Sequence, residues 1–187
     1  LLASIFLWFT AYNAVTTAYS RYAGEVWGLT GGSFANSLMV AGAAAIVSYI
    51  PIGMVASAIG RKKTILIGII IMSLSYFAGF LFVEYSPLIN VVFAFTGIGW
   101  SAINVNSYPM VVEMSRSGDI GKYTGYYYTF SMAAQIFTPI FSGHKDIYKV
   151  LYHECAAFVV SCAMFCGSGA AGSKTAEIKY NSYFAAI

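Results

Sequence analysis

The strongest fold signal in the chain is the stretch Pro-Ile-Gly-Met-Val-Ala-Ser-Ala-Ile-Gly-Arg-Lys-Lys, from Pro51 to Lys63. It begins at the end of a long apolar run, passes through small residues and ends in three adjacent cations before the chain becomes apolar again at Ile65. This pattern is typical of a tight hairpin between two membrane spans. Because loops rich in Lys and Arg stay on the cytoplasmic side of a membrane, the stretch predicts a cytoplasmic hairpin. The orientation of this hairpin fixes the sides on which the other loops lie.

The composition places the whole chain in a membrane. Of its 187 residues, 59% are hydrophobic and 9% are charged, against about 25% charged residues in soluble domains. A spanning helix needs about 20 apolar residues, so six spans with short loops would use nearly all of the chain. We therefore predict an all-α membrane protein with six transmembrane helices, without room for a soluble catalytic domain.

The predicted six-helix bundle covers residues 1–172, with spans at 1–20, 33–60, 64–83, 88–112, 123–143 and 150–172, and a polar tail follows at 173–187. Seven cations fall on the side of Arg61 and three on the other, which predicts that both termini are cytoplasmic. Since the chain opens inside an apolar run, and transporters are often built from repeats of this size, we expect a piece of a larger protein.

Helix contacts are predicted from small residues and from apolar faces. The second span carries small side chains that would let a neighbouring helix approach closely, at Gly42, Ala45, Gly53, Ser57 and Gly60. The third span has no strongly polar side chain between Lys63 and Glu84, so we expect it to face lipid.

Polar residues recur on one face of three spans. They lie three or four residues apart, at Thr10, Asn13 and Thr17 in the first span, at Ser101, Asn104 and Tyr108 in the fourth, and at Tyr127, Ser131, Gln135 and Thr138 in the fifth. Unpaired polar groups facing lipid would each cost several kcal/mol, so these faces should look into the protein or into water.

Four stretches resemble a known family. Gly53-x-x-x-Ser57-Ala58-Ile59-Gly60-Arg61-Lys62 resembles the loop signature of the Major Facilitator Superfamily, although Ser57 stands at its acidic position and Ala58 at its first basic one. The segments 102–113 and 121–135, together with 8–23, are similar to helices ten, eleven and seven of bacterial carriers related to sucrose transporters. The resemblance, which covers about residues 1–143, implies the C-terminal six-helix half of such a carrier.

The resemblance implies a secondary active transporter that moves a sugar or disaccharide by cation-coupled symport, with the proton as coupling ion and by alternating access. Amides and hydroxyls match sugar hydroxyls, and aromatic faces match the apolar side of a sugar ring. The expected substrate-binding residues are Asn13, Tyr12, Asn104, Asn106, Tyr108, Tyr127, Ser131 and Gln135, and the expected gating loop comprises Gly53, Gly60, Arg61 and Lys62.

The expected partners are the lipid bilayer, a small-molecule sugar and a missing N-terminal six-helix half, and the expected location is the bacterial plasma membrane. No ionisable residue lies at membrane depth, so a proton-coupling acid would belong to the other half; Glu113 and Glu154 are read as boundary charges.

Enzymatic and nucleic-acid functions find no support in the sequence. No catalytic triad, paired carboxylates, phosphate loop, metal-ligand spacing or base-reading motif is present, so no cofactor and no nucleic acid is expected. The three cysteines, at positions 155, 162 and 166, are read as packing residues. Two alternatives stay open: a structural or oligomeric membrane protein, and a sodium-coupled carrier of another small solute.

Overall fold

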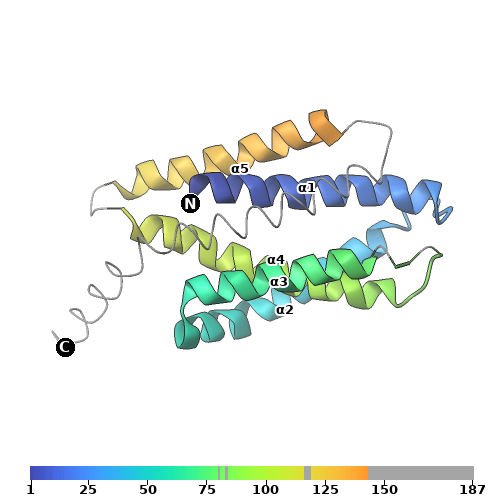
Figure 1. Cartoon of the computed structure of the whole chain (residues 1–187), viewed down its shortest axis with the longest axis horizontal. Helices are drawn as coiled ribbons and strands as arrows, with labels where there is room; N and C mark the ends of the chain where they lie inside the picture. The colour runs from blue at the N-terminus through green and yellow to red at the C-terminus, as the bar shows by residue number, and fades with distance from the viewer. Residues whose placement is uncertain (80, 83, 116–118, 143–187) are drawn as a thin grey trace.

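The computed structural model describes residues 1–79, 81–82, 84–115 and 119–142, with side chains up to residue 140. Within these residues the fold consists of long helices that run up and down (Figure 1): α1 (Leu2–Glu25), α2 (Ala35–Ile59), α3 (Arg61–Gly79), α4 (Ile89–Glu113) and α5 (Ile120–Ser142). The predicted sixth span at 150–172 and the tail at 173–187 lie outside the described residues.

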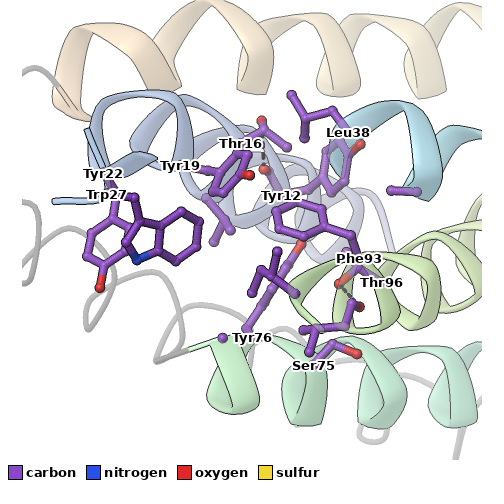
Figure 2. Close-up of a pocket in the computed structure, with 15 residues that line it drawn as sticks. Tyr12, Thr16, Tyr19, Tyr22, Trp27, Leu38, Ser75, Tyr76, Phe93 and Thr96 are labelled. Atoms are coloured by element: carbon purple, nitrogen blue, oxygen red, sulfur yellow. Dashed lines mark hydrogen bonds between the residues drawn. The ribbon is translucent and has the colours of Figure 1, made fainter. Parts of the chain in front are cut away.

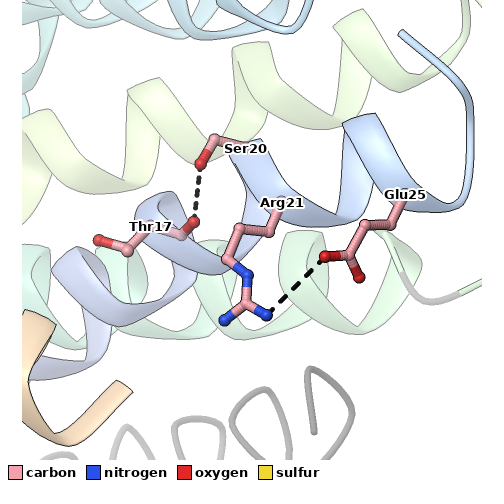
Figure 3. A network of polar contacts seen from close by, with 4 residues as sticks. All are labelled: Thr17, Ser20, Arg21 and Glu25. Atoms are coloured by element: carbon pink, nitrogen blue, oxygen red, sulfur yellow. Dashed lines mark hydrogen bonds and ion pairs between the residues drawn. The ribbon is translucent and has the colours of Figure 1, made fainter. Parts of the chain in front are cut away.

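Helix α1 continues one turn and more beyond the predicted end of the first span at Ser20. The side chains of Arg21 and Glu25, which follow the predicted end of that span, lie on consecutive turns with Nη2 and Oε1 3.8 Å apart. The Ser20 hydroxyl donates to the carbonyl of Thr17 at 2.9 Å (Figure 3). Such exposed pairs at spacing four add only a few tenths of a kcal/mol, but they favour helix over loop.

The hairpin between α2 and α3 is tighter than predicted. Gly60 alone separates the two helices, and the three cations from Arg61 to Lys63 form the first turn of α3 rather than a loop. Gly60 has φ +91°, a conformation that only glycine adopts at low cost, and its N–H donates to the carbonyl of Ala56. The chain therefore reverses direction on one residue.

Three of the helices, α2, α3 and α4, are each long and apolar enough to cross a membrane. Helices α1 and α5 are of similar length, at 24 and 23 residues, but contain more polar and aromatic residues. Large apolar side chains point outward from the bundle, such as Val47 at 76% exposure and Leu74 at 64%. Outward apolar faces of this kind suit a lipid environment. The count of six spans stays a prediction.

Helix α4 lies at the centre of the packing. It packs along both α2 and α3. Helix α1 pairs with α5, as Figure 1 shows. The shared core contains Trp8 from α1, Ile69 and Met72 from α3, Ile103 from α4 and Tyr127 from α5. The core thus joins the two layers of helices.

Two glycines allow α4 to pack this closely. A Cβ atom at Gly97 would lie 2.0 Å from the carbonyl oxygen of Ala41 on α2, and one at Gly99 would lie 2.8 Å from the carbonyl oxygen of Gly68 on α3. Both distances are far below contact distance, so no larger residue fits either crossing without moving a helix. In contrast, open space surrounds Gly42 and Gly53, the glycines singled out in the second span.

The third span, which is expected to face lipid, has one exposed apolar face and one buried face. One face of α3 is buried against α4 and the core, at Ile65, Gly68, Ile69 and Met72. The opposite face carries the exposed side chains of Ile67, Ile70, Leu74 and Phe77. After its first turn the helix is largely apolar on every side, and such a helix shows no single hydrophobic face from which the buried side could be predicted.

Candidate substrate site

A cluster of polar side chains joins α4 to α5. The hydroxyl oxygens of Ser107 and Tyr127 are 3.2 Å apart, and the Tyr127 hydroxyl donates to Oδ1 of Asn104 at 3.5 Å. Tyr127 and Ser107 are almost wholly buried, at 3% and 0% exposure, whereas Asn104 is half-buried. The long contact to Asn104 is weak by the usual geometry of hydroxyl donors, so its amide is available to exchange partners.

The aromatic ring of Tyr108 closes one side of this cluster. Its ring centroid lies 5.4 Å from that of Tyr127 in an edge-to-face arrangement, and its hydroxyl lies 3.2 Å from Oγ1 of Thr124. Hydrogen bonds between helices in a membrane protein contribute about 0.6 kcal/mol on average. Together the contacts fix α4 against α5 around Asn104.

Other predicted site residues use their polar groups within their own helices. The amide of Asn106 donates to the carbonyl of Ala102 at 2.8 Å, and the hydroxyl of Ser131 donates to the carbonyl of Tyr128 at 3.1 Å; both residues are buried. The amide of Asn13 likewise donates to the carbonyl of Phe9, at 2.7 Å.

Gln135 lies on an exposed part of α5. Of the eight predicted site residues, the structure thus brings Asn104, Tyr108 and Tyr127 into one cluster. The role of all eight in binding stays a prediction. Ser107 completes the cluster and was not predicted, although its position three residues after Asn104 places it close on the same helix face.

A second, aromatic cluster is formed by residues of α1, α2 and α4. The ring of Trp100 lies 6.0 Å from that of Tyr12 and 6.4 Å from that of Tyr49. The indole Nε1 of Trp100 is buried, and no hydrogen-bond partner accepts from it within the described part of the chain. Because a buried donor without a partner is costly, this N–H is suited to an acceptor that arrives with a ligand. Tyr49 lies in an apolar run and carries no sequence signal of its own.

Backbone chemistry leaves an acceptor next to Asn104. Helix α4 continues through Pro109, which has no N–H to donate. The carbonyl of Val105, four residues earlier, therefore lacks its helical donor. Val105 stands next to Asn104 in the chain, so a free acceptor accompanies the amide at this level of the helix.

The predicted gating loop is tied to the end of α4 by an ion pair. Nη1 of Arg61, in the first turn of α3, lies 2.5 Å from Oε1 of Glu113, the last residue of α4. Glu113 is therefore a paired charge rather than only a boundary one. Lys62 is half-buried beside it, and the carbonyl of Gly53 accepts a hydrogen bond from the hydroxyl of Ser57 at 3.0 Å.

Removing either charge of this pair should weaken the contact between α3 and α4 slightly. Both side chains are well exposed, so we expect Arg61→Gln and Glu113→Gln each to lower the free energy of unfolding by no more than about 1 kcal/mol. The double variant should lose no more than either single variant, as thermal unfolding of the purified protein would measure. Lys63→Gln, which removes an exposed cation from the same turn, serves as the control. Strictly additive losses from the two single substitutions would show that the charges are not coupled.

Comparisons with known proteins fit this architecture. The family model of the Major Facilitator Superfamily matches residues 1–171. No curated protein and no solved structure matched the chain. Among the described residues, no group of three or more His, Cys, Asp or Glu side chains could hold a metal ion. The chain, with its apolar spanning helices, is an integral membrane protein and belongs to the Major Facilitator Superfamily, a family of membrane transporters.

Proposed function

We propose that these helices form one six-helix half of a secondary active transporter that carries a sugar or disaccharide by alternating access. The observation that carries the proposal is the cluster of Asn104, Ser107 and Tyr127, which gathers an amide and two hydroxyls between α4 and α5. The half-buried amide of Asn104, with only a weak contact to Tyr127, is a group that a purely structural contact between helices would not require. Sites at helix interfaces near the middle of the membrane are typical of secondary transporters.

The chemistry of the two clusters matches that of a sugar. The amide of Asn104 can both donate to and accept from a sugar hydroxyl, as can the hydroxyl of Tyr127. The rings of Tyr12, Tyr49 and Trp100 offer apolar faces for the C–H side of the sugar ring, and the unpaired indole N–H of Trp100 can donate to one of its oxygens.

The coupling ion in this proposal is the proton, and its acceptor is supplied from outside these helices. The acidic residues of the described part of the chain are Glu25, Glu84, Glu113 and Asp119, and each stands at a helix end or between helices. A group that carries a proton across the membrane should lie at depth, where ionisable residues mark proton relays. The partner half would provide it.

In the orientation that we propose, the end of the helix bundle that carries Arg61 faces the cytoplasm. The start of α1, the turn between α2 and α3, the end of α4 and the start of α5 lie at one end of the bundle (Figure 1). Arg61, Lys62, Lys63 and Lys122 belong to that end, so the rule on positive charges favours a cytoplasmic position in a bacterial plasma membrane.

Protection of single cysteines by sugar would test this proposal. In a protein with Cys155, Cys162 and Cys166 replaced by serine, cysteines are introduced at Asn13, Asn104 and Gln135. We expect a water-soluble thiol reagent to label these positions, and sucrose or maltose, at concentrations high enough to offset the loss of the amide, to slow the labelling at position 104. Leu74→Cys, on the exposed apolar face of α3, is the matched control and should label slowly with or without sugar.

The outcomes separate the alternatives. Labelling at Asn104 that resembles the Leu74 control and does not respond to sugar would contradict the proposal and favour a structural role. Protection that requires sodium rather than a proton gradient would favour the sodium-coupled carrier.

A further inference from the structure

A cavity lies away from the Asn104 cluster, between the ends of α1, α3 and α4 that are opposite to Arg61. It measures about 90 Å³, is partly open, and is lined by four of the described helices and by Trp27, in the connection from α1 to α2 (Figure 2). Of the predicted site residues, it includes only Tyr12. The cavity therefore adjoins the proposed substrate site at Tyr12, but its other walls do not belong to that site.

The walls of this cavity present aromatic rings. The ring centroids of Tyr19 and Phe93 are 4.5 Å apart, and those of Tyr22 and Trp27 are 5.1 Å apart in an edge-to-face arrangement. Figure 2 shows the rings of Tyr22 and Trp27 side by side at one end of the cavity. Aromatic pairs of this geometry accept a further ring at an edge or a face.

Three of the wall hydroxyls are engaged within their own helices. The hydroxyls of Thr16, Ser75 and Thr96 each donate to a carbonyl one turn earlier in their own helices, at 3.1, 2.8 and 3.1 Å. The buried hydroxyl of Tyr19 has no hydrogen-bond partner among the described residues. Because most of the remaining surface of the cavity is apolar, the cavity still favours a guest that is mainly apolar.

Two side chains hold the end of the cavity together. The hydroxyl of Tyr22 and the indole Nε1 of Trp27 both donate to the carbonyl of Phe82, between α3 and α4, at 3.2 and 3.3 Å. The connections at this end of the bundle are thereby fixed around the aromatic rings, so the cavity is part of the folded structure rather than a gap between loops.

We propose that this cavity is a second ligand site, which binds a neutral molecule through a single aromatic ring. An apolar cavity of roughly 150 Å³ holds benzene, so a ring fits here when part of it extends through the open side. The proposal does not depend on sugar transport, because none of the wall groups used in it belongs to the Asn104 cluster.

Photolabelling of the full-length protein in lipid vesicles would test the site. The probe is 3-trifluoromethyl-3-phenyldiazirine, a small aromatic molecule that also labels any residue facing lipid. We expect labelling of Tyr22, Trp27 and Phe93 to saturate with probe concentration and to be competed by toluene. Labelling of the exposed residues Ile46 and Ile50 on α2 should rise linearly and serves as the internal reference.

A pair of neighbouring substitutions gives the structural control. Val92→Phe adds a ring inside the cavity, and Val91→Phe adds the same ring on the exposed face of α4, where Val91 is 53% exposed. We expect saturable labelling to fall about tenfold in Val92→Phe, a loss of about 1.4 kcal/mol in binding free energy, and to stay unchanged in Val91→Phe.

The measurements on the unsubstituted protein decide the question even if Val92→Phe fails to fold. Linear labelling of Tyr22, Trp27 and Phe93 without competition by toluene would overturn the proposal, because it would mean that lipid chains fill the cavity. Equal labelling of folded Val92→Phe and Val91→Phe would overturn it as well.

Discussion

Replacing Gly97 by valine is expected to leave little folded protein in the membrane. A Cβ atom at this position would lie 2.0 Å from the carbonyl oxygen of Ala41 and 2.8 Å from its carbonyl carbon, and both are backbone atoms that cannot rotate away. Helix α2 would have to move away from α4 along its length. Overpacking of a rigid contact costs 1–3 kcal/mol or more, and about 3 kcal/mol shifts the folding equilibrium by roughly two orders of magnitude.

Gly42→Val provides the matched control. Gly42 lies on α2, one residue from Ala41, but a Cβ atom there meets no other atom within 4 Å. The yield of monodisperse protein on size-exclusion chromatography, together with the unfolding temperature, would compare the two variants at equal expression. Indistinguishable yields would show that α2 and α4 do not cross at Gly97.

The order of the helices could be predicted because each span is a long apolar run bounded by charges or turn residues. The same pattern predicted the hairpin at Gly60, and the loop signature that ends at Lys62 indicated the superfamily. The start of α3 at Arg61 could not be predicted, since three adjacent cations are equally compatible with a loop and with the first turn of a helix that leaves the membrane.

The rotation of each helix was harder to predict than its existence. Asn104 and Asn106 are two residues apart, which is about 200° around a helix, so they cannot share one face. The spacing of polar residues puts Asn104, with Ser101 and Tyr108, on the polar face, yet both asparagines were expected in the site. The structure places Asn104 toward Tyr127 and Asn106 against its own backbone.

Which residues form the contacts between helices could not be predicted from the sequence. The second span contains several small residues, but which of them meets α4 depends on the rotation of both helices. The close approach is at Ala41 and Gly97, not at Gly42 or Gly53. The aromatic cavity is assembled from four helices and one connection, so no single stretch of the chain carries its pattern.

The second large expected effect is a loss of sugar uptake when the Asn104 cluster is changed. Asn104→Ala removes the amide at the centre of the polar cluster, and Tyr127→Phe removes only the hydroxyl that donates to it. The loss of a hydrogen bond to a desolvated ligand costs about 1–3 kcal/mol, so we expect the apparent uptake efficiency to fall roughly tenfold to a hundredfold. Tyr127→Phe keeps its ring contact with Tyr108 and should be the milder variant.

Asn36→Ala is the control for this pair. Asn36 is an exposed asparagine near the start of α2, away from α5, so its replacement should leave uptake unchanged. Equal amounts of inserted protein in each vesicle preparation exclude differences in folding.

Uptake of radiolabelled sucrose and maltose into proteoliposomes, with and without an imposed proton gradient, tests the proposed sugar carrier most directly. We predict gradient-dependent uptake by the full-length unsubstituted protein and by Asn36→Ala, with loss of that uptake in Asn104→Ala. The absence of glycoside uptake by well-inserted protein, or full uptake by Asn104→Ala, would contradict a sugar site at this cluster.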